Sequence, residues 1–170
     1  MAVLKDNVIL IGMPGSGKST VGVLLAKILG YNFLDSDIVI QQEDGRKLFE
    51  IINQSGIEYF EELENRINSE LSLHKTVLAT GGSVVYGKEA MEHLKRIGTV
   101  VYIKVDLPEL ERRITNLNTR GIVFKDGENF SDLYLKRAPL YEKYADITVT
   151  CGSESQNENA QKLADLLENM

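Results

Sequence analysis

Short runs of consecutive apolar residues alternate along the chain with longer stretches in which apolar residues recur every three or four positions. Runs of the first kind predict buried strands, and stretches of the second kind predict amphipathic helices. Strands are predicted at residues 8–11, 32–34, 76–80, 99–105 and 147–149. Helices are predicted at residues 18–29, 38–43, 48–54, 57–73, 88–96, 108–115, 130–144 and 157–168. Strands that alternate with helices are typical of an α/β fold whose parallel sheet carries helices on both faces.

Composition and charge narrow the class of protein. The chain has 170 residues, 43% of them apolar, which favours a single packed domain over residues 1–170. A formal net charge of −6 gives no electrostatic footprint for binding nucleic acid. One cysteine excludes an internal disulfide, and the first apolar run is too short for a signal peptide or a membrane span. We therefore expect a soluble cytoplasmic protein without a nucleic-acid or membrane partner.

The segment between the first predicted strand and the first predicted helix reads GMPGSGKS from Gly12 onward. It fits the pattern G-x-x-x-x-G-K-[ST], whose glycines let backbone N–H groups surround a di- or triphosphate at a helix N-terminus. Lys18 is expected to reach the β- and γ-phosphates, and the hydroxyl of Ser19 to bind Mg²⁺. The alternative is a glycine-rich turn that only links strand to helix. Because a strand and a helix flank the pattern, we predict a nucleotide site, formed by Gly12, Gly15, Ser16, Gly17, Lys18, Ser19 and Thr20.

Polar and small residues also follow the second and third predicted strands. Asp35 and Asp37 come at the carboxyl end of the second strand, where open α/β sheets bind ligands. A carboxylate there holds Mg²⁺ through water or accepts a proton from a substrate hydroxyl, unless it only caps the next helix. Gly81 and Gly82 follow the third strand and allow a ligand to approach the backbone closely, with a plain turn as the alternative.

Two arginines occur where they would face such a site. Arg120 lies in a predicted loop at residues 116–129, which is rich in Asn, Thr, Gly and Asp. Arg137 begins the sequence RAPLY within the predicted helix at residues 130–144. Either arginine is a ligand of a phosphate or substrate, or a solvated surface charge, and the residues alone leave both interpretations open.

Four segments, IGMPGSGKSTVG, FLDSD, LATGG and RAPLYEKYAD, together resemble the shikimate kinases, in the same order and over nearly the whole chain. The resemblance implies a three-layer α/β P-loop fold, with a five-stranded parallel sheet of order 2-3-1-4-5 and helices on both faces. It also implies an acceptor-binding subdomain at residues 38–73 and a mobile lid at residues 116–129. The implied activity uses ATP and Mg²⁺ to convert shikimate to shikimate 3-phosphate, a step of aromatic amino acid biosynthesis.

The resemblance further implies roles for individual residues. The catalytic residues that it implies are Lys18, Asp37 and Arg120. The residues implied at the nucleotide or its Mg²⁺, besides the remainder of the P-loop, are Ser19, Asp35, Arg113 and Arg120. The residues implied at the acceptor are Asp37, Phe60, Glu61, Gly81, Gly82, Ser83 and Arg137. Among them, Asp37 is the base or orienter of the attacking hydroxyl, Arg137 pairs with the acceptor carboxylate, and Arg113 stacks near the adenine.

The chain departs from the family pattern at three places. Glu61 stands where the family has an arginine that shares the acceptor carboxylate, so an attractive charge is replaced by a repulsive one. Ser83 replaces the last of three glycines after the third strand. Arg120 is followed by Gly121 rather than by the family's proline. Glu61 is expected either to turn to solvent and pair with Arg46 or Arg66, or to face the acceptor.

Three functions are compatible with these residues. The leading one is a monomeric kinase that transfers the γ-phosphoryl group of ATP to a shikimate-like cyclic polyol. The second is a P-loop kinase with another small-molecule acceptor, and the third is a nucleotide-binding regulatory module without activity. The presence of Asp37 argues against the third, because a nucleotide sensor has little need for a base beside the phosphates.

Overall fold

A five-stranded parallel sheet forms the centre of the molecule, in a computed structural model that describes residues 5–114, 122 and 124–170. The strand order is β2-β3-β1-β4-β5, as predicted. The strands are β1 (Asn7–Ile11), β2 (Asn32–Asp35), β3 (Thr76–Ala79), β4 (Gly98–Lys104) and β5 (Ile147–Thr150). In the register of the three central strands, Ile9 lies opposite Leu78 on one side and Val100 on the other. All three side chains are fully buried, so these strands read as continuous apolar runs.

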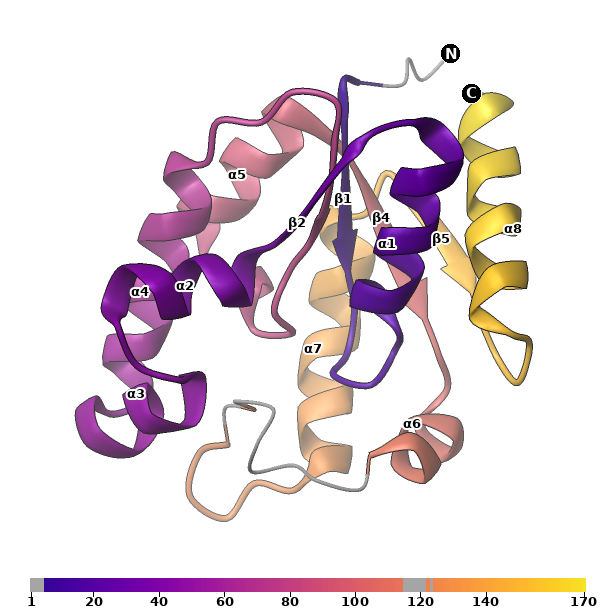
Figure 1. The fold of residues 1–170 in the computed structure, drawn as a ribbon. Helices are drawn as coiled ribbons and strands as arrows, with labels where there is room; N and C mark the ends of the chain where they lie inside the picture. The colour runs from indigo at the N-terminus through magenta and orange to yellow at the C-terminus, as the bar shows by residue number, and fades with distance from the viewer. Residues whose placement is uncertain (1–4, 115–121, 123) are drawn as a thin grey trace.

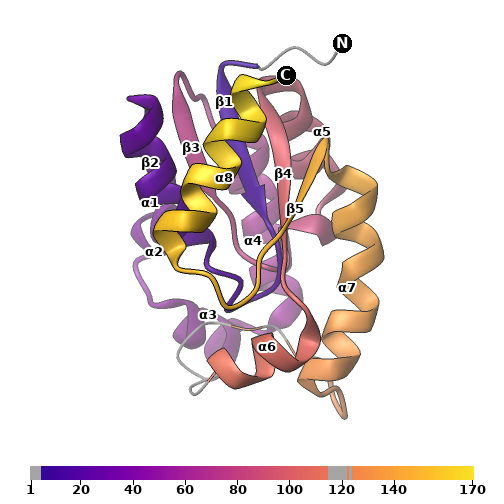
Figure 2. The ribbon, with the colours of Figure 1, turned by 90° about the vertical axis from the view of Figure 1, so that its right-hand side faces the viewer.

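Helices cover both faces of the sheet, which makes the three layers (Figures 1 and 2). On one face lie α1 (Lys18–Leu29) and α8 (Gln156–Glu168), which pack against each other. On the other lie α5 (Lys88–Ile97) and α7 (Phe130–Tyr144), and α6 (Leu107–Arg113) sits near the carboxyl ends of the strands. None of the helices in the described ranges is both long and apolar enough to cross a lipid bilayer.

A second, smaller apolar core lies beside the sheet, between α2 (Ser36–Asp44), α3 (Leu48–Ser55) and α4 (Ile57–Glu70). Its fully or nearly buried members are Ile40, Leu48, Ile51, Phe60, Leu63 and Ile67. Of these helices, α3 and α4 fall within the range 38–73 that was predicted as the acceptor-binding subdomain, and α2 begins two residues before it. The three helices lie to one side of the carboxyl end of β1, and α3 extends beyond it (Figure 1). Open α/β sheets bind ligands at this edge.

The structure differs from the predicted elements at the end of one helix and at one short turn. The helix predicted at 57–73 ends at Glu70, because Leu71 is extended (φ −62°, ψ 131°). Leu71 and Leu73 then both pack against the main core, and their spacing of two suits an extended segment, whereas residues two apart lie on different sides of a helix. A single 3₁₀ turn, η1 (Val84–Tyr86), was not predicted, since three residues are too few to show a period.

Candidate active site

The loop between β1 and α1 has the backbone geometry of a phosphate cradle. Gly15 and Gly17 adopt φ angles of +85° and +97°, which residues with a side chain rarely adopt. The ammonium group of Lys18 donates to the carbonyls of Gly12 (2.8 Å) and Met13 (2.9 Å), and only 8% of Lys18 is exposed. The loop therefore holds a buried cation and the N-terminus of α1 at one place, as binding a phosphate requires.

Asp35 caps the next helix and also contacts the P-loop serine. One carboxylate oxygen of Asp35 accepts from the backbone N–H of Asp37 (2.9 Å) and caps α2. The other accepts from the hydroxyl of Ser19 (2.8 Å). The hydroxyl and the carboxylate are both oxygen ligands of the kind that Mg²⁺ prefers. Within the described ranges no three His, Cys, Asp or Glu side chains form a metal cluster.

Asp37 points toward the same cavity from the first turn of α2. Its Oδ1 atom is buried and has no hydrogen-bond partner in the structure. Burial, and next the charge of Asp35, raise the pKa of Asp37 to about 6, against the opposing effect of Lys18. A carboxylate with a pKa slightly below neutral accepts a proton from a hydroxyl more readily than an ordinary aspartate does.

Arg137 provides the positive charge on the opposite side of the cavity. Only 1% of this residue is exposed, so the surface-charge interpretation is wrong. Its Nε atom donates to the hydroxyl of Tyr86 (3.2 Å), and its guanidinium lies over the Tyr86 ring. Tyr141, one turn further along α7, donates to the carbonyl of Gly82 (2.6 Å). The bond from Tyr141 holds the turn after β3 against α7. A side-chain carbon at Gly82 would lie 2.9 Å from both Pro14 and Arg137, so this position has no room for a side chain.

The predicted site residues converge on one cavity of about 500 Å³. Those that line it are Gly15, Gly17, Lys18, Ser19, Thr20, Asp37, Phe60, Gly81, Gly82, Ser83, Arg113 and Arg137. Gly12 and Ser16 accept hydrogen bonds from the ammonium group of Lys18, and Asp35 accepts one from Ser19. Arg120 and half of the predicted lid, residues 116–121 and 123, lie outside the described residues, and among the described lid residues Ile122 lines the cavity.

Glu61 does not line this cavity but a smaller neighbouring one of about 300 Å³, where it lies near Ser83 and Tyr86. The expected partners of Glu61 are engaged elsewhere: Arg46 with Asp44, and Arg66 with Glu43 and Glu70. The predicted pairing is therefore wrong.

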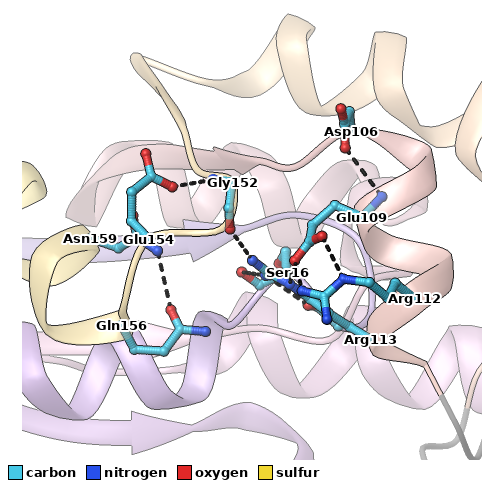
Figure 3. A network of polar contacts seen from close by, with 10 residues as sticks. Ser16, Asp106, Glu109, Arg112, Arg113, Gly152, Glu154, Gln156 and Asn159 are labelled. Carbon is cyan, nitrogen blue, oxygen red and sulfur yellow. Dashed lines mark hydrogen bonds and ion pairs between the residues drawn. The ribbon is translucent and has the colours of Figure 1, made fainter.

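A polar network ties the phosphate loop to two distant segments (Figure 3). Arg113, at the end of α6, donates to the carbonyls of Gly15 (3.3 Å) and Ser16 (3.4 Å). It also donates to the carbonyl of Gly152 and is held by Glu109 (2.9 Å). The hydrogen bonds from Arg112 and then Arg113 lower the pKa of Glu109 to about 2, so Glu109 stays ionised. The prediction that Arg113 stacks near adenine stays a prediction.

Sequence reasoning missed part of the cavity wall. The unpredicted lining residues are Pro14, Leu48, Glu64, Thr80, Ile122 and Gln156. Glu64 could have been found, because its place one turn after Phe60 puts it on the same face of α4. Gln156 carries no such signal, because it reaches the phosphate loop from the start of α8.

Comparison with known proteins gives one consistent result. The family model described as shikimate kinase matches residues 14–168. A shikimate kinase from Actinobacillus succinogenes is 37% identical, covering 97% of this chain and 97% of that protein. One from Haemophilus influenzae is 35% identical, covering 98% of this chain and 94% of that protein. Among solved structures, shikimate kinase from Acinetobacter baumannii in complex with shikimate superposes with a TM-score of 0.90 at 32% identity, covering 97% and 94%.

Proposed function

Because the chain belongs to the shikimate kinase family, we propose that it transfers the γ-phosphoryl group of ATP to the 3-hydroxyl of shikimate. The observation that carries this proposal is the cavity itself. It joins the phosphate cradle to the buried guanidinium of Arg137 and to the carboxylate of Asp37, whose Oδ1 atom is buried. Shikimate presents hydroxyls and one carboxylate, so it offers a partner for each of the two buried groups.

In this proposal the phosphates of ATP lie along the P-loop, against the N-terminus of α1. Lys18 leaves the carbonyls of Gly12 and Met13 to meet the β- and γ-phosphates, where negative charge increases as the phosphoryl group transfers. Asp37 accepts a hydrogen bond from the attacking hydroxyl and orients it toward the γ-phosphorus.

Arg137 holds the other end of the acceptor. A carboxylate at its guanidinium replaces water with a charge-assisted hydrogen bond in a largely dry site. Gly81 and Gly82 let the acceptor ring approach the backbone, since a side chain at either position would occupy the cavity. Phe60 lies beneath the acceptor as part of the second apolar core.

Mg²⁺ is assigned to Ser19 and Asp35, whose hydroxyl and carboxylate oxygens lie together at the end of β2. When bound, the ion neutralises charge on the β- and γ-phosphates. Arg120 is assigned to the transferring phosphoryl group, as the arginine of a lid at residues 116–129. We place the enzyme in the cytoplasm as a monomer.

The test is a screen for ADP release by the purified protein with ATP, Mg²⁺ and one acceptor at a time. Shikimate is expected to give the highest kcat/KM, well above gluconate, adenylyl sulfate and thymidylate. Quinate, which keeps the carboxylate but has a saturated ring, tests how far recognition depends on ring shape. A higher kcat/KM for any of these other acceptors would overturn the assignment of shikimate while leaving the kinase chemistry in place.

A further inference from the structure

The acceptor side of the cavity contains a buried carboxyl group that the mechanism above does not use. Glu64 lies on α4 and is 2% exposed, yet it lines the cavity. Its Oε1 atom accepts a hydrogen bond from the hydroxyl of Ser83 (2.6 Å). Its Oε2 atom is buried and has no hydrogen-bond partner in the structure. A buried oxygen of this kind is costly unless a ligand completes its hydrogen bonding.

The unpartnered oxygen of Glu64 faces the place where the acceptor binds. A side-chain carbon at Gly81 would lie 2.7 Å from Oε2 of Glu64 and 2.8 Å from Oδ1 of Asp37. Oδ1 of Asp37 is also buried without a partner. Two such oxygens therefore flank one small space, which stays open because residue 81 is glycine.

The surroundings of Glu64 disfavour a negative charge on it. The charged groups that act on it are Asp37 of α2, Glu61 of α4 and Arg137 of α7, so two of the three repel a carboxylate. Burial, which is the largest effect, and the two acids raise the pKa of Glu64 to about 8, while Ser83 and Arg137 oppose the rise. At neutral pH, Glu64 is mostly a neutral acid with one O–H to donate.

We propose that Glu64 is a specificity-determining residue that binds the acceptor as a protonated acid, accepting from Ser83 at Oε1 and donating from Oε2 to an acceptor oxygen. The inference rests on the proposed function, because it concerns the same cavity and the same acceptor. The acceptor oxygen that Glu64 contacts lies next to the hydroxyl that Asp37 orients. Two neighbouring hydroxyls of the acceptor are therefore recognised together, one by Glu64 as a donor and the other by Asp37 as an acceptor. Glu64 and Ser83 thus supply a neutral hydrogen-bonding wall in a chain that carries Glu61 where its family has a cation.

The test compares Glu64→Gln with Glu64→Ala. The amide of glutamine accepts through its oxygen and donates through its nitrogen, so it reproduces a protonated acid but not a carboxylate. Alanine provides neither group. We expect Glu64→Ala to raise the KM for shikimate at pH 7 at least tenfold, with a smaller effect on kcat. Glu64→Gln is expected to recover most of that loss.

The pH dependence separates the two protonation states. With saturating ATP and Mg²⁺, the wild-type KM for shikimate should rise about tenfold between pH 7 and pH 9, as Glu64 ionises. In Glu64→Gln the rise should be less than twofold. Glu62→Gln, on an exposed position of the same helix, is the matched control and should keep the wild-type profile. Equal pH profiles in wild type and Glu64→Gln would overturn the inference, as would equal KM values for the glutamine and alanine variants.

A second measurement is independent of turnover. In protein labelled with ¹³C at the glutamate carboxyl carbons, the resonance missing from Glu64→Gln belongs to Glu64. Its titration midpoint should lie near pH 8, and a midpoint near 4.5 would overturn the inference by itself. Failure of the wild type to release ADP with shikimate, by contrast, would contradict the proposed function, and the ¹³C titration would still decide the protonation state.

Discussion

Three ionisable side chains of the cavity, Lys18, Glu64 and Arg137, are almost entirely removed from water before any substrate binds. Each is held by hydrogen bonds to the protein: Lys18 to backbone carbonyls, Glu64 to Ser83, and Arg137 to Tyr86. Groups that are already desolvated and oriented need little reorganisation when charge moves during phosphoryl transfer. The reactivity of the site therefore depends on a few buried polar side chains whose positions are already fixed by hydrogen bonds.

Lys18→Met should reduce kcat at least about 10³-fold while leaving the fold intact, because it removes the charge that meets the transferring phosphoryl group. Steady-state kinetics with shikimate, together with circular dichroism, measure both properties. Lys27→Met, on an exposed position of the same helix, is the control and should retain wild-type turnover. A Lys18→Met protein with turnover within threefold of wild type would contradict the role of the P-loop.

Glu61→Arg should lower the KM for shikimate about tenfold, because one charge-assisted hydrogen bond contributes about 1.5–3 kcal/mol. Residue 61 lines the neighbouring cavity, which shares Ser83 with the acceptor cavity, so the prediction requires the longer arginine side chain to reach past Ser83. Glu62→Arg makes the same change of charge at an exposed position and should leave the KM unchanged. If both variants have the wild-type KM for shikimate, residue 61 takes no part in acceptor binding.

At the scale of elements, local signals in the sequence predict most of the P-loop and of the helix α1 that follows it. The bounds of α1 agree with the predicted helix because its apolar period and the stop at Gly30 are both local. The bonds from Arg113 to Gly15 and Gly152 were not predictable, since these residues meet only after the sheet has formed. Its pair with Glu109, one turn earlier in α6, is local. The Ser83–Glu64 bond was not predictable either, since it joins a turn to a helix 19 residues away.

Arg113→Ala should raise the KM for ATP about tenfold, because the P-loop carbonyls lose the group that ties them to α6 and to Gly152. The KM for shikimate should change much less. Arg112→Ala is the matched control, since Arg112 shares Glu109 but is exposed and is not in the lining of the cavity. An Arg113→Ala enzyme whose KM for ATP equals that of Arg112→Ala would show that this network does not position the phosphate loop.

At the scale of the whole molecule, the acidic site affects folding as well as catalysis. Glu64 has a raised pKa in the folded protein and an ordinary one in the unfolded chain. Between about pH 4.5 and pH 8 the folded protein therefore holds a proton that the unfolded chain releases. The contribution of this group to stability is fully present below the lower value and is lost as pH rises through the higher one. Glu64 thus lowers the stability of the fold at alkaline pH, and at neutral pH it provides a hydrogen-bond donor in the cavity.

Glu64→Gln should accordingly be more stable than wild type at pH 8, by an amount on the order of 3 kcal/mol, and similar to wild type at pH 4.5. Urea unfolding at the two pH values measures the difference. Glu62→Gln again serves as the control, with no expected pH-dependent gain. A stability difference between wild type and Glu64→Gln that is the same at both pH values would contradict a proton on Glu64.

The account as a whole depends on which acceptor the cavity takes. The most direct measurement is ³¹P and ¹³C NMR of a reaction that contains the purified protein, ATP, Mg²⁺ and shikimate. We predict that ADP and shikimate 3-phosphate appear in equal amounts, with the new phosphorus coupled to the carbon that carries the 3-hydroxyl. Release of inorganic phosphate without phosphorylated shikimate, or a phosphate on another hydroxyl, would contradict the arrangement of Asp37, Glu64 and Arg137 around the acceptor.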